Sequence, residues 1–293
     1  MINIRLPDSL GCTVASTSVL QSLIKCELFD DIHVFTKHFE LVSHLQGINL
    51  HPPVDNTFLH VDLRKYTSRR PHNNRPYRAS YLHMLEMAEE SLAVKLPIIL
   101  PNIPTHESDA CFAKEIISTF SKPLIWIQSK TTTDNRNWNY KRWLTLIKNL
   151  SNNFDFIDLS NVNYSLLQSL AITKYSFAGI CLDSFLVHGS AAVGAENVIV
   201  LAGSSRGECI TYPGQSLIYE ESECIAQPCG MHGYYSGCKK EHEQMFLDCD
   251  CINTDKFACM NKIDITQVEN LIKNFKTSSN NAILNYEIKY ATP

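Results

Sequence analysis

The sequence lacks two features: a long apolar run and an excess of positive charge. A membrane-spanning helix needs roughly 18 or more consecutive apolar residues, and the longest candidates are interrupted by Lys95, Pro97, Pro101 and Glu196. The formal net charge is −4, so bulk electrostatics gives no reason to expect a nucleic-acid partner. We therefore expect no transmembrane segment and no nucleic acid, while a peripheral membrane contact is compatible with both features.

The chain also lacks a recognisable leader, a short internal repeat and a low-complexity tract. Residues 1–5 lead directly into what looks like a first strand, without the charged and apolar regions of a signal peptide. The expectation is a cytoplasmic protein. Its 293 residues, 44% hydrophobic and 19% charged, have the balance of a soluble globular chain with one large or two ordinary domains.

Cysteine, in contrast, is abundant, with eleven residues in the chain. Six of them share one segment: Cys224, Cys229, Cys238, Cys249, Cys251 and Cys259. In a reducing compartment such a cluster is more typical of metal binding than of disulfides.

Four thiolates are enough to close a tetrahedral metal site. We predict that Cys224, Cys229, Cys238 and Cys259 supply them, and either of the two remaining cysteines could replace one. Zn²⁺ is the default metal and iron is the rival, because both accept four sulfur ligands. Free buried cysteines are the alternative. The cysteines lie far along the sequence from the candidate ligand-binding residues described below, so we expect a structural metal and no catalytic one.

The clearest structural pattern is a strand, turn, helix and strand over residues 176–201. A short apolar run ends at Cys181, Asp183 and Ser184 are good N-cap residues, and Gly194 follows an apolar helix. Such a unit points a helix N-terminus at the carboxyl edge of a parallel sheet. Free N–H groups and the helix dipole favour a phosphate there. An ordinary βα turn is the alternative.

Similar alternation runs along the whole chain. The patterns predict strands over 2–6, 32–35, 58–61, 123–128, 154–159, 177–181, 198–201 and 217–220. They predict helices over 14–25, 39–45, 77–94, 140–150, 164–172, 186–193 and 265–275. The proline-rich segment 96–104 is the candidate linker. We therefore predict an α/β fold with two Rossmann-like lobes, an N-terminal lobe over 1–104 and a C-terminal lobe over 105–293.

Three separated stretches together resemble the family-9 glycosyltransferases, which include the ADP-heptose:lipopolysaccharide heptosyltransferases. They are residues 4–20 (IRLPDSLGCTVASTSVL), 128–143 (QSKTTTDNRNWNYKRW) and 183–194 (DSFLVHGSAAVG). The first stretch is similar to the opening strand, Gly-containing turn and helix of the family. The second is similar to a family segment with two Thr, a basic residue and two Trp at this spacing. The third is similar to the family's Asp-Thr…His…Ala-Ala segment. The later cysteines also look like a set seen in many members.

The resemblance implies a GT-B fold, with the acceptor mainly on the N-terminal lobe and the nucleotide sugar mainly on the C-terminal lobe. It implies an inverting transfer, independent of a catalytic metal, from a nucleotide diphosphate sugar such as ADP-heptose. A role in lipopolysaccharide biosynthesis would follow, with a glycan, a lipid-linked molecule or a protein as acceptor.

Candidate donor-binding residues follow from both lines of reasoning. They are Thr131, Thr132, Arg136, Asp183, Ser184 and His188. Arginine gives charge-assisted, often bidentate bonds to phosphate, and threonine gives neutral ones. The alternative for the threonine–arginine stretch is a polar surface loop. Asp183 could instead be a simple N-cap, and His188 could be a structural histidine.

Two positions depart from the family. Phe185 stands where a small residue is usual, which bears on the shape of the donor pocket. Cys12 stands where the family has the Asp that acts as catalytic base, and a thiol is a poor equivalent for deprotonating a sugar hydroxyl. Asp8 lies in the same turn and is our candidate base. The alternatives are a catalytically inactive glycosyltransferase-like subunit and a metal-stabilised binding protein.

A basic loop stands out in this acidic chain. Its cations are Arg64, Lys65, Arg69, Arg70, Arg75 and Arg78. The loop could hold an anionic acceptor, and a solvated surface loop is the alternative.

Overall fold

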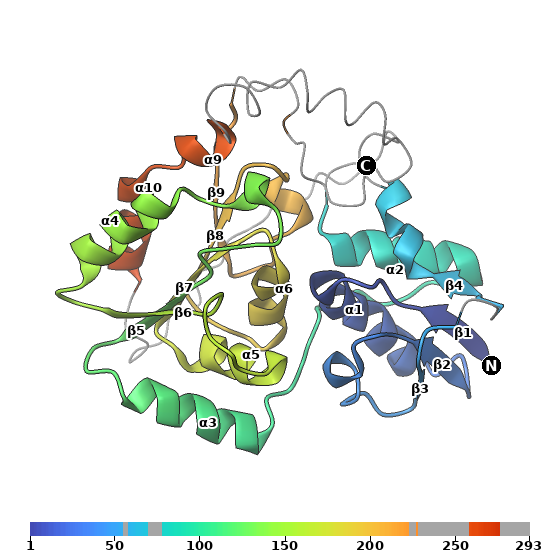
Figure 1. The fold of residues 1–293 in the computed structure, drawn as a ribbon. Coiled ribbons are helices and arrows are strands. Elements are labelled where there is room, and N and C mark those ends of the chain that lie inside the picture. The colour runs from blue at the N-terminus through green and yellow to red at the C-terminus, as the bar shows by residue number, and fades with distance from the viewer. Residues whose placement is uncertain (55–57, 70–77, 223–226, 228–257, 276–293) are drawn as a thin grey trace.

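The computed structural model describes residues 1–54, 58–69, 78–222, 227 and 258–275. Within them the chain forms two α/β units that lie side by side, each built on a parallel sheet (Figure 1). None of the described helices is both long and apolar enough to cross a membrane.

The first unit carries a four-stranded parallel sheet with the order β3-β2-β1-β4. Its strands are β1 (Ile2–Arg5), β2 (Ile32–Phe35), β3 (Asn49–His51) and β4 (Val61–Asp62). Helices α1 (Leu10–Cys26) and α2 (Ser80–Leu92) pack against each other. Two 3₁₀ segments, η1 (Phe39–Leu41) and η2 (Leu63–Arg69), complete this unit.

The second unit carries a five-stranded parallel sheet with the order β6-β5-β7-β8-β9. The strands are β5 (Leu124–Ile127), β6 (Asp155–Asp158), β7 (Ala178–Leu182), β8 (Val198–Ala202) and β9 (Ser216–Tyr219). The helices are α3 (Glu107–Ser118), α4 (Tyr140–Leu150), α5 (Leu166–Tyr175), α6 (Phe185–Ala192), α9 (Ala258–Lys262) and α10 (Ile265–Asn274). Short 3₁₀ turns are η4 (Asp134–Arg136) and η5 (Gly207–Cys209).

Successive residues of a strand in the second sheet belong to two separate hydrophobic cores, because successive side chains of a strand point to opposite faces of the sheet. Ile125 and Ile127 of β5 belong to the core that includes α4 and α10, whereas Leu124 and Trp126 belong to the core that includes α5 and α6. The helices therefore cover both faces of this sheet. Trp138 and Trp143 meet edge to face in the first of these cores, with ring centroids 5.0 Å apart.

The α/β class and the parallel sheets expected from the sequence are confirmed. One expected helix is wrong in extent, because residues 39–45 form only the single 3₁₀ turn η1. The backbone leaves the helical range at Val42, with a φ of −130° and a ψ of −10°, so the turn does not continue into a longer helix. The sequence also missed β3, α3 and α9, which are short or carry few apolar residues at a regular period.

Polar side chains of α1 hold the proline-rich segment 96–104. Ser22 Oγ donates to the Pro97 carbonyl at 2.7 Å, Gln21 Nε2 donates to the Asn102 carbonyl at 2.9 Å, and Ser18 Oγ donates to the Ile99 carbonyl. At the far end of the segment, the Ile103 amide donates to the Ala192 carbonyl of α6 at 2.8 Å. The segment is thus bonded to both lobes. The lobe boundary at residue 104 stays a prediction.

His44 also contacts this segment, and it makes the stability of the fold depend on pH. Its Nε2 bonds the Asn102 carbonyl at 3.0 Å, and its buried Nδ1 has no hydrogen-bond partner among the described residues. Burial lowers the pKa of His44, and the charge of His106 lowers it further against the opposing effect of the Asn102 carbonyl. A histidine with a lowered native pKa binds its proton first in the unfolded chain. The stability that it contributes is complete above the unfolded value, about 6.5, and is lost as the pH falls through that value toward the native one.

We predict that the unfolding free energy falls less steeply between pH 7.5 and pH 5.5 in His44→Gln than in the parent chain. Urea unfolding at several pH values in this range measures the difference, and the titrations that both proteins share cancel in it. Parallel pH profiles for the two proteins would contradict the prediction.

Candidate functional site

The candidate site lies at the carboxyl edge of the second sheet, where the chain leaves β5, β7 and β8. Strand β5 bonds β6 on one side and β7 on the other, and the helices that follow β5 and β7 lie on opposite faces of the sheet. In open parallel sheets this reversal of strand order leaves a crevice between the two loops, which is the usual place for a ligand.

Arg136 joins the loop after β5 to the loop after β7. Its Nε donates to Thr133 Oγ1 at 2.8 Å and its Nη2 donates to Thr132 Oγ1 at 2.8 Å. Its Nη1 donates to the Asp183 carbonyl at 2.6 Å. A guanidinium has five N–H groups, so two stay outside the bonds that it makes with the described residues.

The charge of Arg136 persists despite its burial. Burial lowers the pKa of the guanidinium, and the neighbouring Asp183 carboxylate opposes this. Because an arginine in a protein stays protonated in the physiological range, the loop keeps a positive charge. None of the hydrogen bonds of Thr131 among the described residues is to Arg136. The Thr131 hydroxyl donates within the loop, to the Thr133 carbonyl at 2.8 Å, and stabilises the loop itself.

Asp183 and Ser184 precede α6, but neither acts as a side-chain cap. Ser184 is the N-cap residue and makes no capping bond; its hydroxyl accepts from Gln128 Nε2 at 3.1 Å. Asp183 is buried, and its carboxylate accepts a hydrogen bond of 2.5 Å from Ser205. The first N–H groups of α6 therefore have no side-chain acceptor from its N-cap residue and can bind an anion.

His188 lies further along α6, where that helix meets α1 of the other lobe. Its imidazole is buried, and its Nδ1 is 2.7 Å from the Tyr212 hydroxyl. A Cβ built on Gly11 would lie 2.6 Å from Cδ2 of His188, so only glycine fits at this contact. The structure thus groups Arg136 with Thr132, Asp183 and Ser184, and places His188 at the junction between the lobes.

Phe185 packs within the second lobe. A Cβ built on Gly189 would lie 3.5 Å from its ring and 2.4 Å from the Leu170 side chain of α5. The aromatic ring at this position therefore extends along α6 toward α5 and contributes to the core.

Asp8 follows β1 at the carboxyl edge of the first sheet. It pairs with Arg5 at 2.5 Å and with Lys37 at 3.1 Å, and its side chain is 46% exposed. Burial opposes its ionisation, but the hydrogen bonds and charges of Lys37 and Arg5 outweigh burial, so the pKa of Asp8 lies below its ordinary value. Cys12, one turn away, is 3.0 Å from the Tyr66 hydroxyl through its Sγ.

Of the predicted metal ligands, only Cys259 belongs to the described residues. Cys224, Cys229 and Cys238 lie outside them, as do Arg70 and Arg75 of the basic loop. Cys259 is buried, and its Sγ would lie 3.0 Å from a Cβ built on Gly203. The described part of the chain contains no group of three or more His, Cys, Asp or Glu side chains that could hold a metal.

Sequence reasoning missed Gln128, Ser205 and Tyr212. The signal for Ser205 was present, because Ser204 and Ser205 follow a buried strand in the same parallel sheet and had to arrive at the same edge. Gln128 likewise follows β5 directly. Tyr212 could not have been found, because its bond to His188 joins a loop to a helix that are separated along the chain.

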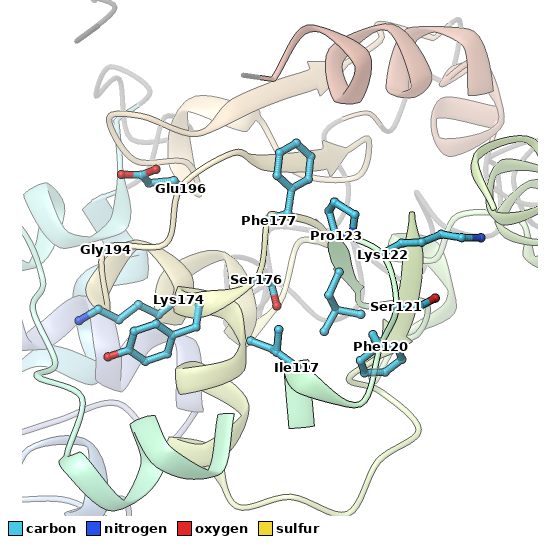
Figure 2. A pocket seen from close by; sticks show the side chains of 12 residues that line it. Ile117, Phe120, Ser121, Lys122, Pro123, Lys174, Ser176, Phe177, Gly194 and Glu196 are labelled. Carbon is cyan, nitrogen blue, oxygen red and sulfur yellow. The ribbon is translucent and has the colours of Figure 1, made fainter. Parts of the chain in front are cut away.

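A shallow surface hollow of about 660 Å³ lies at the opposite edge of the second sheet, before β5, β7 and β8 (Figure 2). Its lining includes Lys122, Pro123, Lys174, Phe177 and Glu196. None of the candidate site residues lines it.

Solved structures of other proteins share this fold. No protein-family model and no curated protein matches the sequence. The chain is similar to a solved glycosyltransferase of family 9 from Veillonella parvula, with 14% identity, 93% of this chain and 97% of that chain covered, and a TM-score of 0.64.

Two further solved structures are similar. One is the ADP-heptose lipopolysaccharide heptosyltransferase II of E. coli, with 13% identity and a TM-score of 0.55. The match covers 75% of this chain and 91% of that chain. The other is the iron-containing dodecameric glycosyltransferase TibC of enterotoxigenic E. coli, with 13% identity and a TM-score of 0.60. The match covers 94% of this chain and 76% of that chain.

The chain has the GT-B fold. Its two lobes match those of glycosyltransferases over most of their length, and the resemblance to family 9 expected from the sequence is confirmed at the level of the fold. At sequence identities this low, the match supports the fold and does not identify a substrate or a mechanism.

The bonds of Arg136 lead to a prediction about stability. We expect Arg136→Ala to lower the unfolding free energy, because it leaves the buried Asp183 carbonyl without this donor and costs about 1–3 kcal/mol. Lys130→Ala is the matched control, since Lys130 is an exposed cation of the same loop. Urea unfolding of both variants measures the difference, and an equal loss in the two would contradict the structural role of Arg136.

Proposed function

We propose that this chain is an inverting glycosyltransferase, which moves a heptose-like sugar from a nucleotide diphosphate sugar to a hydroxyl of its acceptor. The main support is the group of side chains at the carboxyl edge of the second sheet, where a buried arginine and an uncapped helix N-terminus lie at a reversal of strand order. The proposal divides the chain into an acceptor lobe over 1–104 and a donor lobe over 105–293.

The chemistry of this edge suits a diphosphate. The two remaining N–H groups of Arg136, the hydroxyl of Thr132 and the first amides of α6 are donors for phosphate oxygens. Thr131 supports the loop that carries Thr132 and Arg136. Asp183 offers a carboxylate oxygen, which suits a sugar or ribose hydroxyl better than a phosphate. Ser184 and His188 complete the proposed set.

The proposed donor is an ADP-activated heptose or a related sugar. One similar solved structure is heptosyltransferase WaaC of E. coli with ADP, and another is TibC in complex with ADP-D-β-D-heptose. The proposed reaction uses no catalytic metal, because Arg136 and α6 can offset the charge of the leaving nucleotide diphosphate.

Asp8 is the proposed base. Its lowered pKa keeps it ionised at neutral pH, but a weaker base removes a proton from a sugar hydroxyl less effectively. Cys12 in place of the family Asp favours the alternative of a catalytically inactive subunit that binds a nucleotide sugar without transferring the sugar.

The proposed acceptor is anionic. Several cations follow the strands at the carboxyl edge of the first sheet, among them Lys37 after β2 and Arg64 and Lys65 after β4. Asp8 and Asp62 pair with these cations. A phosphorylated or carboxylated glycan, a lipid-linked molecule or an acidic protein segment fits this edge. Lipopolysaccharide biosynthesis in the cytoplasm, with peripheral contact to the membrane, is the setting that the proposal implies.

We further propose a structural metal, zinc or iron, held by Cys224, Cys229, Cys238 and Cys259. Thiolate sulfur suits both metals, and the similar structure of TibC is described as iron-containing. Cys259 packs beside Gly203, directly after β8, so such a metal would stabilise the chain close to the donor edge.

Turnover of ADP-heptose tests the enzyme and its base. We expect Asp8→Asn to lower kcat by about two orders of magnitude, the usual scale for a general base, and Cys12→Ser to lower it far less. Asp62→Asn is the matched control, because Asp62 is also paired with cations at the same sheet edge.

Each outcome of that assay has a separate meaning. A larger loss in Cys12→Ser than in Asp8→Asn would show that the base is misplaced. A parent protein that is stabilised by ADP in a thermal-shift assay but turns over no donor would favour the inactive subunit.

Elemental analysis tests the metal. Protein purified without chelator or histidine tag should contain close to one equivalent of zinc or iron, and Cys259→Ser should lower this content. Less than about a tenth of an equivalent in the parent, with the thiols freely titratable in the folded state, would contradict the proposed site.

A further inference from the structure

The loop after β8 contains a buried hydroxyl that binds the carboxylate of Asp183. Ser205 is 2% exposed and Asp183 is 8% exposed, and Ser205 Oγ lies 2.5 Å from Asp183 Oδ2. The hydroxyl is the donor in this bond, because a carboxylate has no proton to donate. Strands β7 and β8 are neighbours, with Leu182 in register with Leu201, so both residues lie just beyond the same edge of the sheet.

Contacts on both sides of Ser205 hold the loop that carries it. Before it, a Cβ built on Gly203 would lie 2.7 Å from the Met260 Sδ of α9, so the chain passes closely against that helix. After it, the Arg206 carbonyl accepts from the Cys209 amide at 3.0 Å and begins the turn η5. The loop is packed at one end and closed by a turn at the other, which gives the hydroxyl a defined position.

The main chain of Asp183 is held separately, from the loop after β5. Arg136 Nη1 donates to the Asp183 carbonyl at 2.6 Å, and this bond does not involve the carboxylate. Ser205 binds one carboxylate oxygen, Oδ2. The other, Oδ1, has no hydrogen-bond partner among the described residues, and it is not one of their fully covered polar atoms. This second oxygen can therefore accept a hydrogen bond from a ligand.

An aspartate without such a support has several orientations. Its side chain has three staggered wells about χ1 and a broad torsion about χ2, so its oxygens can turn in different directions. The bond from Ser205 selects one of these orientations for Asp183. An acceptor that is fixed before the ligand arrives binds the ligand more tightly, because less conformational freedom is lost on binding.

We propose that Ser205 is a positioning residue, which holds Asp183 so that its second oxygen is a fixed acceptor for a ring hydroxyl of the donor substrate. A carboxylate repels phosphate and accepts from hydroxyls. The hydroxyls beside a diphosphate are those of the ribose and those of the transferred sugar. The ligand in this inference rests on the proposed function, whereas the support that Ser205 gives to Asp183 does not.

The test uses the full chain and calorimetry with two probes, ADP and ADP-heptose. The variants are Ser205→Ala, Asp183→Ala and the double variant that combines them. Ser204→Ala is the matched control, because Ser204 is the preceding residue and is 1% exposed, and its buried Oγ has no hydrogen-bond partner among the described residues. Urea unfolding of the same proteins reports their stability.

We expect Ser205→Ala to bind ADP-heptose about three-fold more weakly, since a carboxylate released into three χ1 wells occupies each for about a third of the time. In the Asp183→Ala background the same replacement should change the affinity no further, because the side chain through which Ser205 acts is absent. Ser204→Ala should bind both probes as the parent does. A loss with ADP-heptose alone assigns the hydroxyl to the transferred sugar, and an equal loss with ADP assigns it to the ribose.

Other results would overturn the positioning role. An unchanged affinity of Ser205→Ala for both probes would do so, as would an equal loss in Ser204→Ala. A loss of the same size with and without the Asp183 carboxylate would also do so, because a merely structural role gives that result.

The unfolding free energies form a second cycle, which needs no ligand. Additive losses in Ser205→Ala and Asp183→Ala would show that the two side chains do not support each other. If the parent binds neither probe, the proposed donor site and the ligand named here fail together, and the unfolding cycle still decides whether Ser205 holds Asp183.

Discussion

The contact between Gly11 and His188 is the constraint on which the arrangement of the two lobes depends. Gly11 lies in the first turn of α1, after β1, and His188 lies near the start of α6, after β7. Helices that follow parallel strands begin at the carboxyl edge of their sheet. When two such helix starts touch, the carboxyl edges of both sheets must face the same junction. A side chain at position 11 would separate them.

This arrangement explains why residues from distant parts of the chain can serve one reaction. Asp8 and the cations near it belong to the edge of the first sheet, and Arg136 and Asp183 belong to the edge of the second. The proline-rich segment does not act as a free linker, because α1 bonds it along its length and α6 bonds its end. The lobes are therefore held in contact at the junction, and we place the proposed transfer there.

The sequence predicted those parts of the fold that repeat a pattern. Buried strands such as β7 and β8 are continuous apolar runs, and helices such as α4 place apolar residues at regular spacing, so local rules suffice. Strand β3 has one apolar residue among three, and a local rule cannot detect it. Only its pairing with β2 makes it a strand.

The candidate site was predictable to a similar degree. Side chains that directly follow a strand, such as Asp183, could be assigned to one edge, because parallel strands deliver their carboxyl ends together. Their partners could not be assigned, because the bond from Arg136 to Asp183 and the bond between Tyr212 and His188 depend on how loops fold back. The sequence therefore predicted which residues gather but not that Arg136 also supports the loops it joins.

The charges around Asp8 bear on how the proposed transfer would be accelerated. A carboxylate held by Arg5 and Lys37 has a lowered pKa and takes a proton less readily. A transfer through an oxocarbenium-like state depends on two events, departure of the nucleotide diphosphate and attack by the acceptor. If the base contributes less to attack, stabilisation of the departing charge must contribute more. Arg136 and the first amides of α6 are fixed donors of that kind, and fixed donors need no reorganisation as the charge develops. On this argument Cys12 in place of a carboxylate need not abolish catalysis, because the greater part of the proposed acceleration comes from the donor lobe.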